Sequence, residues 1–363
     1  MSFPRAEPGR PRPCHGPRYP ATCPLHRIPS RQPAVQCVLV STALLAVLGG
    51  FPPRAASATS RLVRNLEAGE NQTLVAYGTS LTAVGAWVDQ LRVVLDRQFP
   101  NQVTVVNAAQ GGATSDWGLR NLDDKVLAHE PDTVLIEFSV NDAVTSPQTP
   151  VTHARENLET MIDRIAESNP DTEIILMVMN RPVGHTATAR PNLASFNQMV
   201  RDVARARGLR LIDHFPAWEK LLAENPGQFL ACVPDSIHPM RSGSLLVSTP
   251  LILRELGLPP AAADASRDEP LERYLFRSLM DADKDGKVTR GEFRNHWRRQ
   301  FDKTDTDADG SLTEAELHSA DLLAFFDADD DSRVEIDEYL PRFQPLFEQY
   351  ADAAEQTITT ADF

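Results

Sequence analysis

Three residue types that together can activate a serine hydroxyl occur in two separated segments of the chain. Ser80 lies in Gly78-Thr79-Ser80-Leu81, and an Asp and a His lie three positions apart in Asp235-Ser236-Ile237-His238-Pro239. On one tight turn, a carboxylate and an imidazole at this spacing can face the same side. The imidazole can then take the serine proton while the carboxylate holds its tautomer. The chemistry indicated is nucleophilic attack by serine through an acyl-enzyme.

The elements that must position these residues are predicted by the hydrophobic pattern. From Leu74 to about Leu256, short apolar runs alternate with longer amphipathic ones, which is typical of βαβ units. The predicted strands are 73–77, 103–107, 133–138, 173–179 and 209–212, and the predicted helices are 85–98, 120–129, 152–167, 193–207 and 241–256. Several strands are almost wholly apolar, so we expect a mostly parallel five-stranded sheet in a three-layer α/β/α sandwich.

The candidate residues follow successive strands. Ser80 follows the first strand, Gly112 the second and Asn141 the third, and the Asp235–His238 turn follows the last. Ligand sites in open α/β sheets form at the carboxyl ends of the strands, so we expect these residues to meet at one edge. Each also has a simpler interpretation as a helix cap or a turn residue. Asp142, Arg181 and His185 could also line this edge or be ordinary surface polar groups.

Four sequence blocks between residues 70 and 256 resemble those of the SGNH (GDSL-like) esterases and lipases. The blocks are YGTSLT (77–82), NAAQGGATS (107–115), SVND (139–142) and DSIHP (235–239). The resemblance implies a flavodoxin-like hydrolase fold in which Ser80 is the nucleophile, His238 the general base and Asp235 the group that orients the imidazole. It also implies an oxyanion hole formed by the backbone N–H groups of Ser80 and Gly112 and the Asn141 side-chain amide. Catalysis of this kind requires no cofactor.

The chain departs from the family pattern at two positions. Thr79 replaces the usual Asp before the nucleophile, and Ser139 replaces the usual Gly of the third block. Neither position has one of the roles named above. We therefore expect the two departures to affect loop geometry and substrate fit rather than catalytic competence.

Three acidic segments of the C-terminal region resemble EF-hand calcium loops. They are DADKDGKVTRGE (281–292), DTDADGSLTEAE (305–316) and DADDDSRVEIDE (327–338), each with Asp at positions 1, 3 and 5 and Glu at position 12. This spacing wraps oxygen ligands around Ca²⁺, with the last carboxylate bidentate. The predicted ligand positions, including position 7 of each loop, are Asp281, Asp283, Asp285, Lys287, Glu292, Asp305, Asp307, Asp309, Ser311, Glu316, Asp327, Asp329, Asp331, Arg333 and Glu338.

The loops differ at position 6, where the backbone must turn sharply. Gly286 and Gly310 occupy it in the first two loops and Ser332 in the third, so the third loop should bind calcium more weakly or with more strain. Residues 351–362 keep the apolar position 8 but lack the first two carboxylates, as in a degenerate fourth hand. We predict that the first loop pairs with the second and the third with the fourth. Extracellular calcium would keep even modest sites loaded, which favours a structural or docking role, with no partner indicated.

The N-terminal segment has the pattern of a secretory signal peptide. A Pro- and Arg-rich lead (1–34) precedes an apolar run (35–51) and then Ala56-Ser57-Ala58, which predicts cleavage before Thr59. The alternative is an uncleaved anchor, but the apolar run is short for a membrane span. We expect an exported protein with no transmembrane span in the mature chain.

Cleavage would change both the charge and the cysteine content of the chain. Residues 1–58 contain seven Arg and one Glu, so their removal changes the formal charge from −14 to −20. A chain this acidic is poorly suited to bind nucleic acid through a general basic surface. Cys14, Cys23 and Cys37 would leave with the leader, and Cys232 alone could form no intramolecular disulfide.

The sequence therefore predicts four segments: a leader (1–58), a hydrolase domain (59–257), a linker (258–270) and a small all-α EF-hand domain (271–363). The expected function is that of an exported serine esterase acting on small acyl esters, with acetyl groups on polysaccharides as the first hypothesis. A lipase, lysophospholipase or thioesterase is the alternative within enzymes. A calcium-dependent surface or adhesion protein with an inactive hydrolase domain is the alternative outside them.

Overall fold

The computed structural model describes residues 59–145, 148–259, 280–352 and 354–359. The predicted leader, its cleavage site and most of the predicted linker lie outside the described residues. The described residues belong to one compact unit. Among the described residues, no helix combines the length and the apolar character needed to cross a bilayer.

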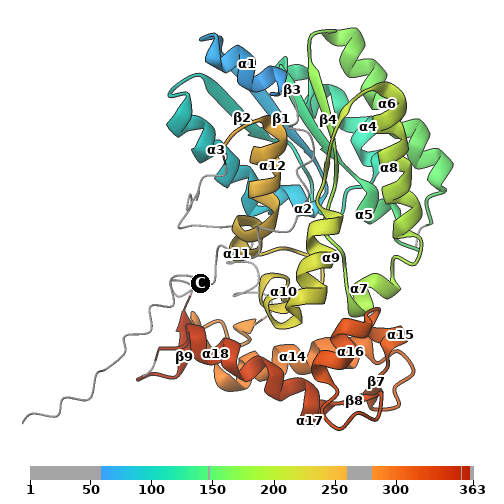
Figure 1. Cartoon of the computed structure of the whole chain (residues 1–363), viewed down its shortest axis with the longest axis vertical. Helices are drawn as coiled ribbons and strands as arrows, with labels where there is room; N and C mark the ends of the chain where they lie inside the picture. Colours follow the sequence, from blue (N-terminus) through green and yellow to red (C-terminus); the bar gives the residue numbers. More distant parts are fainter. Residues whose placement is uncertain (1–58, 146–147, 260–279, 353, 360–363) are drawn as a thin grey trace, which may run out of the picture. The chain divides into compact units, whose positions relative to one another are not determined.

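The centre of the molecule is a five-stranded sheet in which all neighbouring strands are parallel (Figure 1). Its strands are β1 (Gln72–Gly78), β2 (Val103–Asn107), β3 (Thr133–Glu137), β4 (Glu173–Val178) and β5 (Arg210–Asp213), and their spatial order is β2-β1-β3-β4-β5. The predicted parallel sheet is confirmed. The strand order reverses direction between β1 and β3, where open α/β sheets form a crevice at their carboxyl edge.

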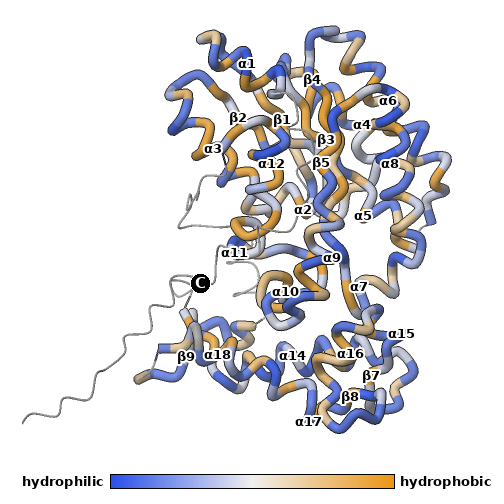
Figure 2. The backbone as a smooth tube through the Cα atoms, in the orientation of Figure 1, coloured by the Kyte–Doolittle hydropathy of each residue, from blue (hydrophilic) through white to orange (hydrophobic). Residues whose placement is uncertain are grey.

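Helices cover both faces of the sheet. One face packs against α1 (Arg61–Glu67), α3 (Ala86–Gln98) and α12 (Thr249–Leu256), and the other against α4 (Ser115–Lys125), α6 (Val151–Ser168) and α8 (Leu193–Arg207). Successive β1 residues alternate between the two faces: Leu74 and Ala76 enter the first core, and Val75 and Tyr77 the second. The central strands are accordingly hydrophobic along their length (Figure 2). The expected three-layer sandwich is therefore present.

Some helix boundaries differ from the prediction. The predicted helix 120–129 is α4, which starts at Ser115, followed by a short 3₁₀ turn over Leu127–His129. The predicted helix 241–256 is divided into α11 (Arg241–Gly243), a π-helical turn (Ser244–Ser248) and α12. Two unpredicted helices follow β5, α9 (Phe215–Glu224) and α10 (Pro226–Cys232), and both have proline in the first helical turn, where its missing N–H costs nothing.

The C-terminal region contains short helices and two small antiparallel sheets. Its elements are β6 (Lys287–Thr289), α14 (Arg290–Thr304), β7 (Ser311–Leu312), α15 (Glu314–Leu317), α16 (Ala320–Phe326), β8 (Val334–Glu335), α17 (Ile336–Tyr339), a 3₁₀ turn (Leu340–Phe343), α18 (Gln344–Tyr350) and β9 (Thr357–Thr359). β6 pairs with β9, and β7 pairs with β8. Each pair joins the apolar residues at position 8: Val288 with Ile358, and Leu312 with Val334.

The predicted pairing of the acidic loops was therefore wrong. The first loop pairs with segment 351–362, and the second pairs with the third. The reason lies in the connecting helices. The first and second loops are joined by the single helix α14, which at 15 residues is about 22 Å long and holds them apart. The third loop and segment 351–362 are likewise joined by nearly continuous helix, whereas α15 and α16 form a break that lets the second and third loops meet.

One hydrophobic core joins the C-terminal region to the part of the hydrolase segment that follows β5. Trp218 of α9 and Phe229 of α10 belong to the same buried cluster as Phe293, Trp297 and Phe301 of α14. All five side chains are at most 4% exposed. The two regions are thus packed through buried aromatic side chains.

Candidate active site

Ser80, His238 and Asp235 form a continuous chain of hydrogen-bonding side chains. The Ser80 Oγ atom lies 2.8 Å from Nε2 of His238, and Nδ1 of His238 lies 2.6 Å from Oδ2 of Asp235. The carboxylate can only accept, so Nδ1 donates and Nε2 is left free to accept the serine proton. The structure therefore brings together residues that are 158 positions apart in the chain, in the order required for general-base activation.

The turn that carries Asp235 and His238 is fixed by its backbone. Oδ1 of Asp235 accepts hydrogen bonds from the backbone N–H of Ile237 at 3.2 Å and of His238 at 2.8 Å, while Ser236 has a φ of +73°. Burial alone would raise the pKa of Asp235, but hydrogen bonds from His238 outweigh it and leave the pKa below its ordinary value. The carboxyl group is therefore ionised, as the imidazole partner requires.

Ser80 is positioned by the tight connection between β1 and α2 (Ser80–Ala83). Thr79 caps α2: its hydroxyl oxygen accepts from the N–H of Leu81. Gly78 is required because a Cβ atom there would collide with Glu137 of β3. The nucleophile candidate therefore lies at the beginning of a helical turn, directly after β1.

The buried carboxylate of Glu137, on the neighbouring strand β3, holds the connection between β1 and α2 by hydrogen bonds. It accepts hydrogen bonds from the N–H and hydroxyl of Thr79 at 2.7 and 2.9 Å and from the hydroxyl of Thr82 at 2.8 Å. Burial raises the pKa of Glu137 to about 7 despite these hydrogen bonds. We did not predict this role from the sequence, although a single charged residue within the apolar strand 133–138 was a usable signal.

Hydrogen bonds tie the second block to the first and the third block to the second. The N–H of Gln110 donates to the Gly78 carbonyl at 3.0 Å, and the Asn141 side-chain amide donates to the Ala113 carbonyl at 2.9 Å. Gly112 is exposed and has a φ of +74°, a conformation that favours glycine. Asn141 lies in α5 (Ser139–Asp142), after β3. These hydrogen bonds place the residue after Gly112 beside the Asn141 amide, and the segment before Gly112 beside the end of β1, the strand that Ser80 follows.

Two further polar residues, neither of them predicted, hold the surroundings of the site. Asn180, two residues after β4, is buried and donates to the Ile237 carbonyl at 2.7 Å. Arg190 donates to the carbonyls of Val140 at 2.8 Å and Thr186 at 2.9 Å. No spacing pattern in the sequence distinguished either residue.

The three polar residues left open by the sequence have different positions. Asp142 is buried and accepts from the N–H of Ser115 at 2.8 Å; burial raises the pKa of Asp142 to about 6. Arg181 pairs with Glu219 at 2.8 Å and also donates to the His318 carbonyl. Burial lowers the pKa of His185. None of the three forms a hydrogen bond to the triad, so they stay outside the candidate catalytic group.

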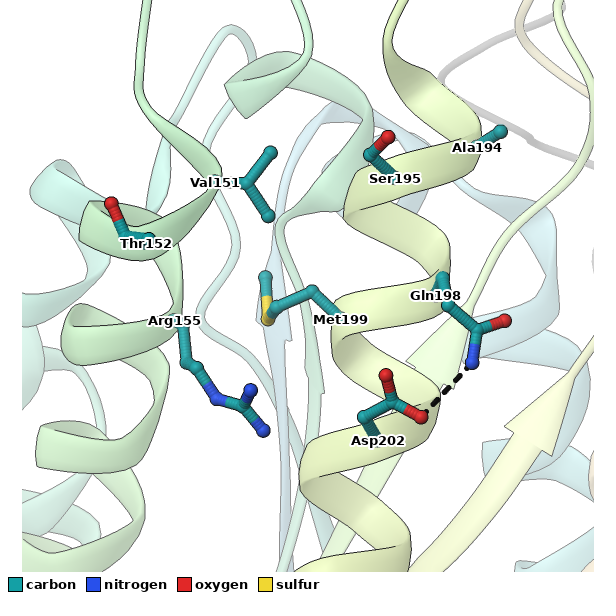
Figure 3. A pocket seen from close by; sticks show the side chains of 8 residues that line it. All are labelled: Val151, Thr152, Arg155, Ala194, Ser195, Gln198, Met199 and Asp202. Atoms are coloured by element: carbon teal, nitrogen blue, oxygen red, sulfur yellow. Dashed lines mark hydrogen bonds between the residues drawn. The ribbon is translucent and has the colours of Figure 1, made fainter.

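A surface hollow between α6 and α8 lies apart from these residues (Figure 3). Its lining includes Val151, Arg155, Met199 and Asp202, but none of Ser80, Asp235 and His238. The hollow therefore does not provide an acyl-binding pocket for the serine.

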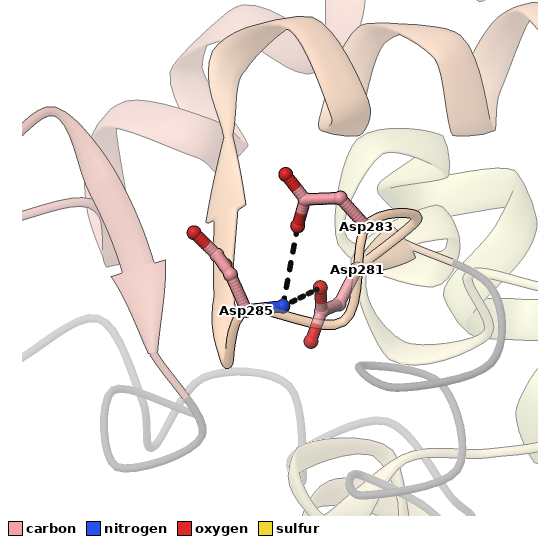
Figure 4. A group of neighbouring side chains, drawn as sticks. All are labelled: Asp281, Asp283 and Asp285. Carbon is pink, nitrogen blue, oxygen red and sulfur yellow. Dashed lines mark hydrogen bonds between the residues drawn. The ribbon is translucent and has the colours of Figure 1, made fainter.

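Within the described residues, the three acidic loops each gather carboxylates into a cluster that could hold a cation. The ligand atoms of each cluster lie within 4.8 Å of one another, and the clusters are Asp281 with Asp283 and Asp285, Asp305 with Asp307 and Glu316, and Asp327 with Asp329 and Glu338. In the first loop the backbone N–H of Asp285 donates to the carboxylates of Asp281 at 3.1 Å and Asp283 at 3.2 Å (Figure 4). Gly286, Gly310 and Ser332 have φ values of +88°, +89° and +68°. Hard oxygen donors in tight loops suit Ca²⁺.

The fold and the hydrogen bonds that link Ser80, His238 and Asp235 point to a class of protein: a hydrolase with an α/β/α sandwich and a candidate serine nucleophile at the carboxyl edge of its parallel sheet. Residues 74–245 match the model of the GDSL-like Lipase/Acylhydrolase family. This part of the chain is similar to the GDSL-like lipases and acylhydrolases, and the protein is an ester-hydrolysing enzyme. No curated protein matches the chain.

Several solved structures resemble the hydrolase part. A lipase/acylhydrolase from Enterococcus faecalis is 29% identical and covers 52% of this chain and 98% of its own, with a TM-score of 0.45. LAE5, an α/β hydrolase enzyme from the metagenome of Lake Arreo, is 21% identical over 52% and 96% of the two chains, with a TM-score of 0.46. Axe2, an acetylxylan esterase from Geobacillus stearothermophilus, is 19% identical. The match covers 53% of this chain and 97% of Axe2, with a TM-score of 0.46.

Proposed function

We propose that the protein is an exported serine esterase that hydrolyses small acyl esters through an acyl-enzyme. The observation that carries the proposal is the 2.8 Å contact between the Ser80 Oγ and His238 Nε2 atoms, with Asp235 on the opposite nitrogen of the ring. His238 takes the proton of Ser80 as the oxygen attacks the ester carbonyl, and then gives it to the departing alkoxide. A water molecule, activated by the same imidazole, releases the acid and restores Ser80.

The negative charge on the carbonyl oxygen requires donors that are already in place. We assign these to the N–H groups of Ser80 and Gly112 and to the free N–H of the Asn141 amide. The other amide hydrogen of Asn141 is held by the Ala113 carbonyl, which supports a fixed orientation. Asp235 keeps Nδ1 of His238 protonated and stabilises the imidazolium that forms.

A p-nitrophenyl ester series from acetate to palmitate tests the reaction and the acyl preference together. We expect release of p-nitrophenol from short esters by the wild type and a loss of roughly 10⁴-fold or more in kcat for Ser80→Ala. Ser195→Ala is the matched control, since Ser195 is an exposed residue of α8 lining the hollow in Figure 3. If the wild type and Ser80→Ala are equally inactive on every ester, the serine esterase proposal is refuted. Faster hydrolysis of long chains would instead favour the lipase, lysophospholipase or thioesterase alternative.

We further propose that acetyl groups on polysaccharides are the physiological substrates. This step rests on the SGNH resemblance and on the predicted export of the chain. Release of acetate from acetylated xylan compared with release from a neutral triglyceride distinguishes a carbohydrate esterase from a lipase. Activity confined to the triglyceride would contradict the carbohydrate substrate.

We also propose that the acidic loops bind Ca²⁺ as a structural ion. The donor set supports this: the three clusters are acidic, and position 6 of each loop has the positive φ that the turn around the ion requires. Lys287, Ser311 and Arg333 would contribute their backbone carbonyl oxygens at position 7. Ca²⁺ bound at each site would neutralise part of the repulsion among carboxylates and stabilise the folded region.

Calorimetric titration of chelator-treated protein with Ca²⁺ tests the metal assignment. Glu316→Gln should lose one binding site, because Glu316 is the position-12 ligand of the second loop. Glu314→Gln is the control: it removes the same charge from the same helix at an exposed position outside the ligand set. An unchanged melting temperature after chelation, with no heat of binding, would contradict the calcium proposal.

Export is proposed from the leader pattern of residues 1–58, with Thr59 as the first mature residue. N-terminal sequencing of protein recovered outside the cytoplasm tests it. A chain that begins before the apolar run at residue 35 would favour the uncleaved anchor.

A further inference from the structure

The turn that carries Asp235 and His238 is contacted by the acidic-loop region. His296 of α14 is 1% exposed, and its Nε2 atom lies 3.2 Å from the carbonyl oxygen of Pro234. A carbonyl oxygen can only accept, so the imidazole donates this hydrogen bond. Pro234 is joined directly to Asp235. A single peptide unit therefore separates His296 from the acid of the triad.

A second route between α14 and the same turn passes through α7 (Gly184–Thr188). The Ser236 carbonyl accepts hydrogen bonds from the N–H of Val183 at 3.0 Å and the hydroxyl of Thr186 at 2.8 Å. Thr304, at the end of α14, packs so closely on Gly184 that a Cβ atom there would lie 2.9 Å from its Oγ1. Helix α14 thus supports the turn directly through His296 and indirectly through Thr304.

The position of α14 is set at both ends by acidic loops. The helix begins at Arg290, inside the first loop, and ends at Thr304, the residue before the second loop. At its start, Glu292 accepts from the N–H groups of Thr289 and Ala282, so the helix and the loop share a carboxylate. When the two flanking loops are ordered, they therefore fix both ends of α14, the helix that carries His296.

We propose that His296 is a positioning residue of the esterase site and that α14 couples calcium binding in its two flanking loops to the Asp235–His238 turn. The inference rests on the proposed function and extends it, since it makes the acidic-loop region part of the support for catalysis. His296 touches no reacting atom. It acts by fixing the Pro234 carbonyl through a hydrogen bond. The position of Pro234 in turn fixes the orientation of the Asp235 carboxylate toward the His238 imidazole.

Substitutions at His296 separate this role from simple packing. His296→Phe keeps a ring and removes the donor, whereas His296→Gln places an amide N–H near the position of Nε2. Asn295→Ala, on the exposed side of the same helix, is the matched control. We expect His296→Phe to lower kcat by roughly 10- to 100-fold with little change in KM, because a small displacement of a catalytic group is costly. His296→Gln should recover most of the loss, and Asn295→Ala should behave as wild type.

The pH profile of kcat/KM separates the two roles, because a loss of packing at His296 would not by itself change the pH dependence. A displaced Asp235 stabilises the imidazolium less, so the acidic limb of the profile should shift to lower pH in His296→Phe only. A folded Phe variant whose kcat falls less than about threefold, or which changes only KM, overturns the proposal. If the Phe variant does not fold, His296→Asn, whose amide is too short to reach Pro234, replaces it under the same criteria.

Amide hydrogen exchange over residues 233–240 tests the coupling without any substrate. We expect faster exchange there after calcium removal from the wild-type protein, and a smaller effect of calcium in His296→Phe, since the two changes share one route. Equal calcium effects in both proteins overturn the coupling. This measurement also distinguishes the two proposals: an enzyme inactive on all esters refutes the proposed function, whereas the exchange data alone decide whether α14 holds the turn.

Discussion

Glu137 Oε1 lies 2.7 Å from the backbone nitrogen of Thr79, the residue that precedes the serine. A carboxylate from the neighbouring strand thus holds the nucleophile connection where the family pattern would place an Asp in the connection itself. Because Glu137 is buried, this support depends on a group whose pKa is raised to about 7.

The raised pKa of Glu137 predicts a pH dependence of stability. Between its ordinary value of 4.5 and about 7, the folded protein binds a proton that the unfolded chain has lost, so the free energy of unfolding falls as pH rises. The contribution is about 3 kcal/mol over this window. Glu137→Gln cannot titrate and should lose this slope, so its stability relative to wild type should improve from pH 5 to pH 8.

Urea unfolding of both proteins at pH 5 and pH 8 measures the difference. Glu167→Gln, an exposed residue of α6, is the control and should keep the wild-type slope. Parallel pH dependences for wild type and Glu137→Gln would show that the carboxyl group titrates at its ordinary pKa.

Replacement of Asp235 by Asn should abolish most of the activity while leaving the fold intact. The amide would present an N–H to His238 Nδ1 and stabilise the wrong tautomer, which typically lowers kcat by about 10⁴-fold. Steady-state kinetics, with circular dichroism to check folding, measure the loss. Asp213→Asn serves as the control, since Asp213 pairs with Arg201 rather than with the triad. Activity of Asp235→Asn near the wild-type level would remove Asp235 from the mechanism.

Asn141→Ala tests the side-chain donor of the oxyanion hole. We expect kcat to fall by roughly 10²- to 10³-fold with a small change in KM, because the donor is needed mainly in the transition state. Asn121, whose amide bonds the Trp117 carbonyl within α4, offers a control substitution to Ala. An effect on KM alone would indicate that Asn141 binds the substrate in the ground state, and would exclude its amide as an oxyanion-hole donor.

Ser332→Gly should improve the third acidic loop. Ser332 has a φ of +68°, where a side chain costs about 1 kcal/mol and glycine costs little. The variant should bind Ca²⁺ more tightly at this loop and melt at a higher temperature in its presence. Gly310→Ser, the reverse substitution at position 6 of the second loop, where φ is +89°, is the comparison and should weaken binding. Weaker binding by Ser332→Gly would mean that the hydroxyl, not the backbone, determines affinity there.

Sequence reasoning predicted the parts of the molecule that depend on local pattern. The parallel strands follow from apolar runs such as 173–179, and the residues after them follow from the rule that sites form at strand ends. The pairing of the acidic loops was missed because it depends on which connecting helix is continuous, a property that loop spacing alone does not reveal. Asn180 and His296 were missed for a related reason: each donates to a backbone carbonyl. Because every residue has a backbone carbonyl, such a hydrogen bond cannot be predicted from residue types or their spacing.

The buried aromatic cluster shared by α9, α10 and α14 also has a consequence for biosynthesis. Trp218 and Phe229 are synthesised well before Phe293, Trp297 and Phe301, yet all five belong to one core. The first two side chains therefore lack part of their packing until the C-terminal region has emerged from the ribosome. Because the Asp235–His238 turn also depends on that region, a chain truncated before α14 should be an inactive, aggregation-prone intermediate, and competence for catalysis should arrive only with the final segment of the polypeptide.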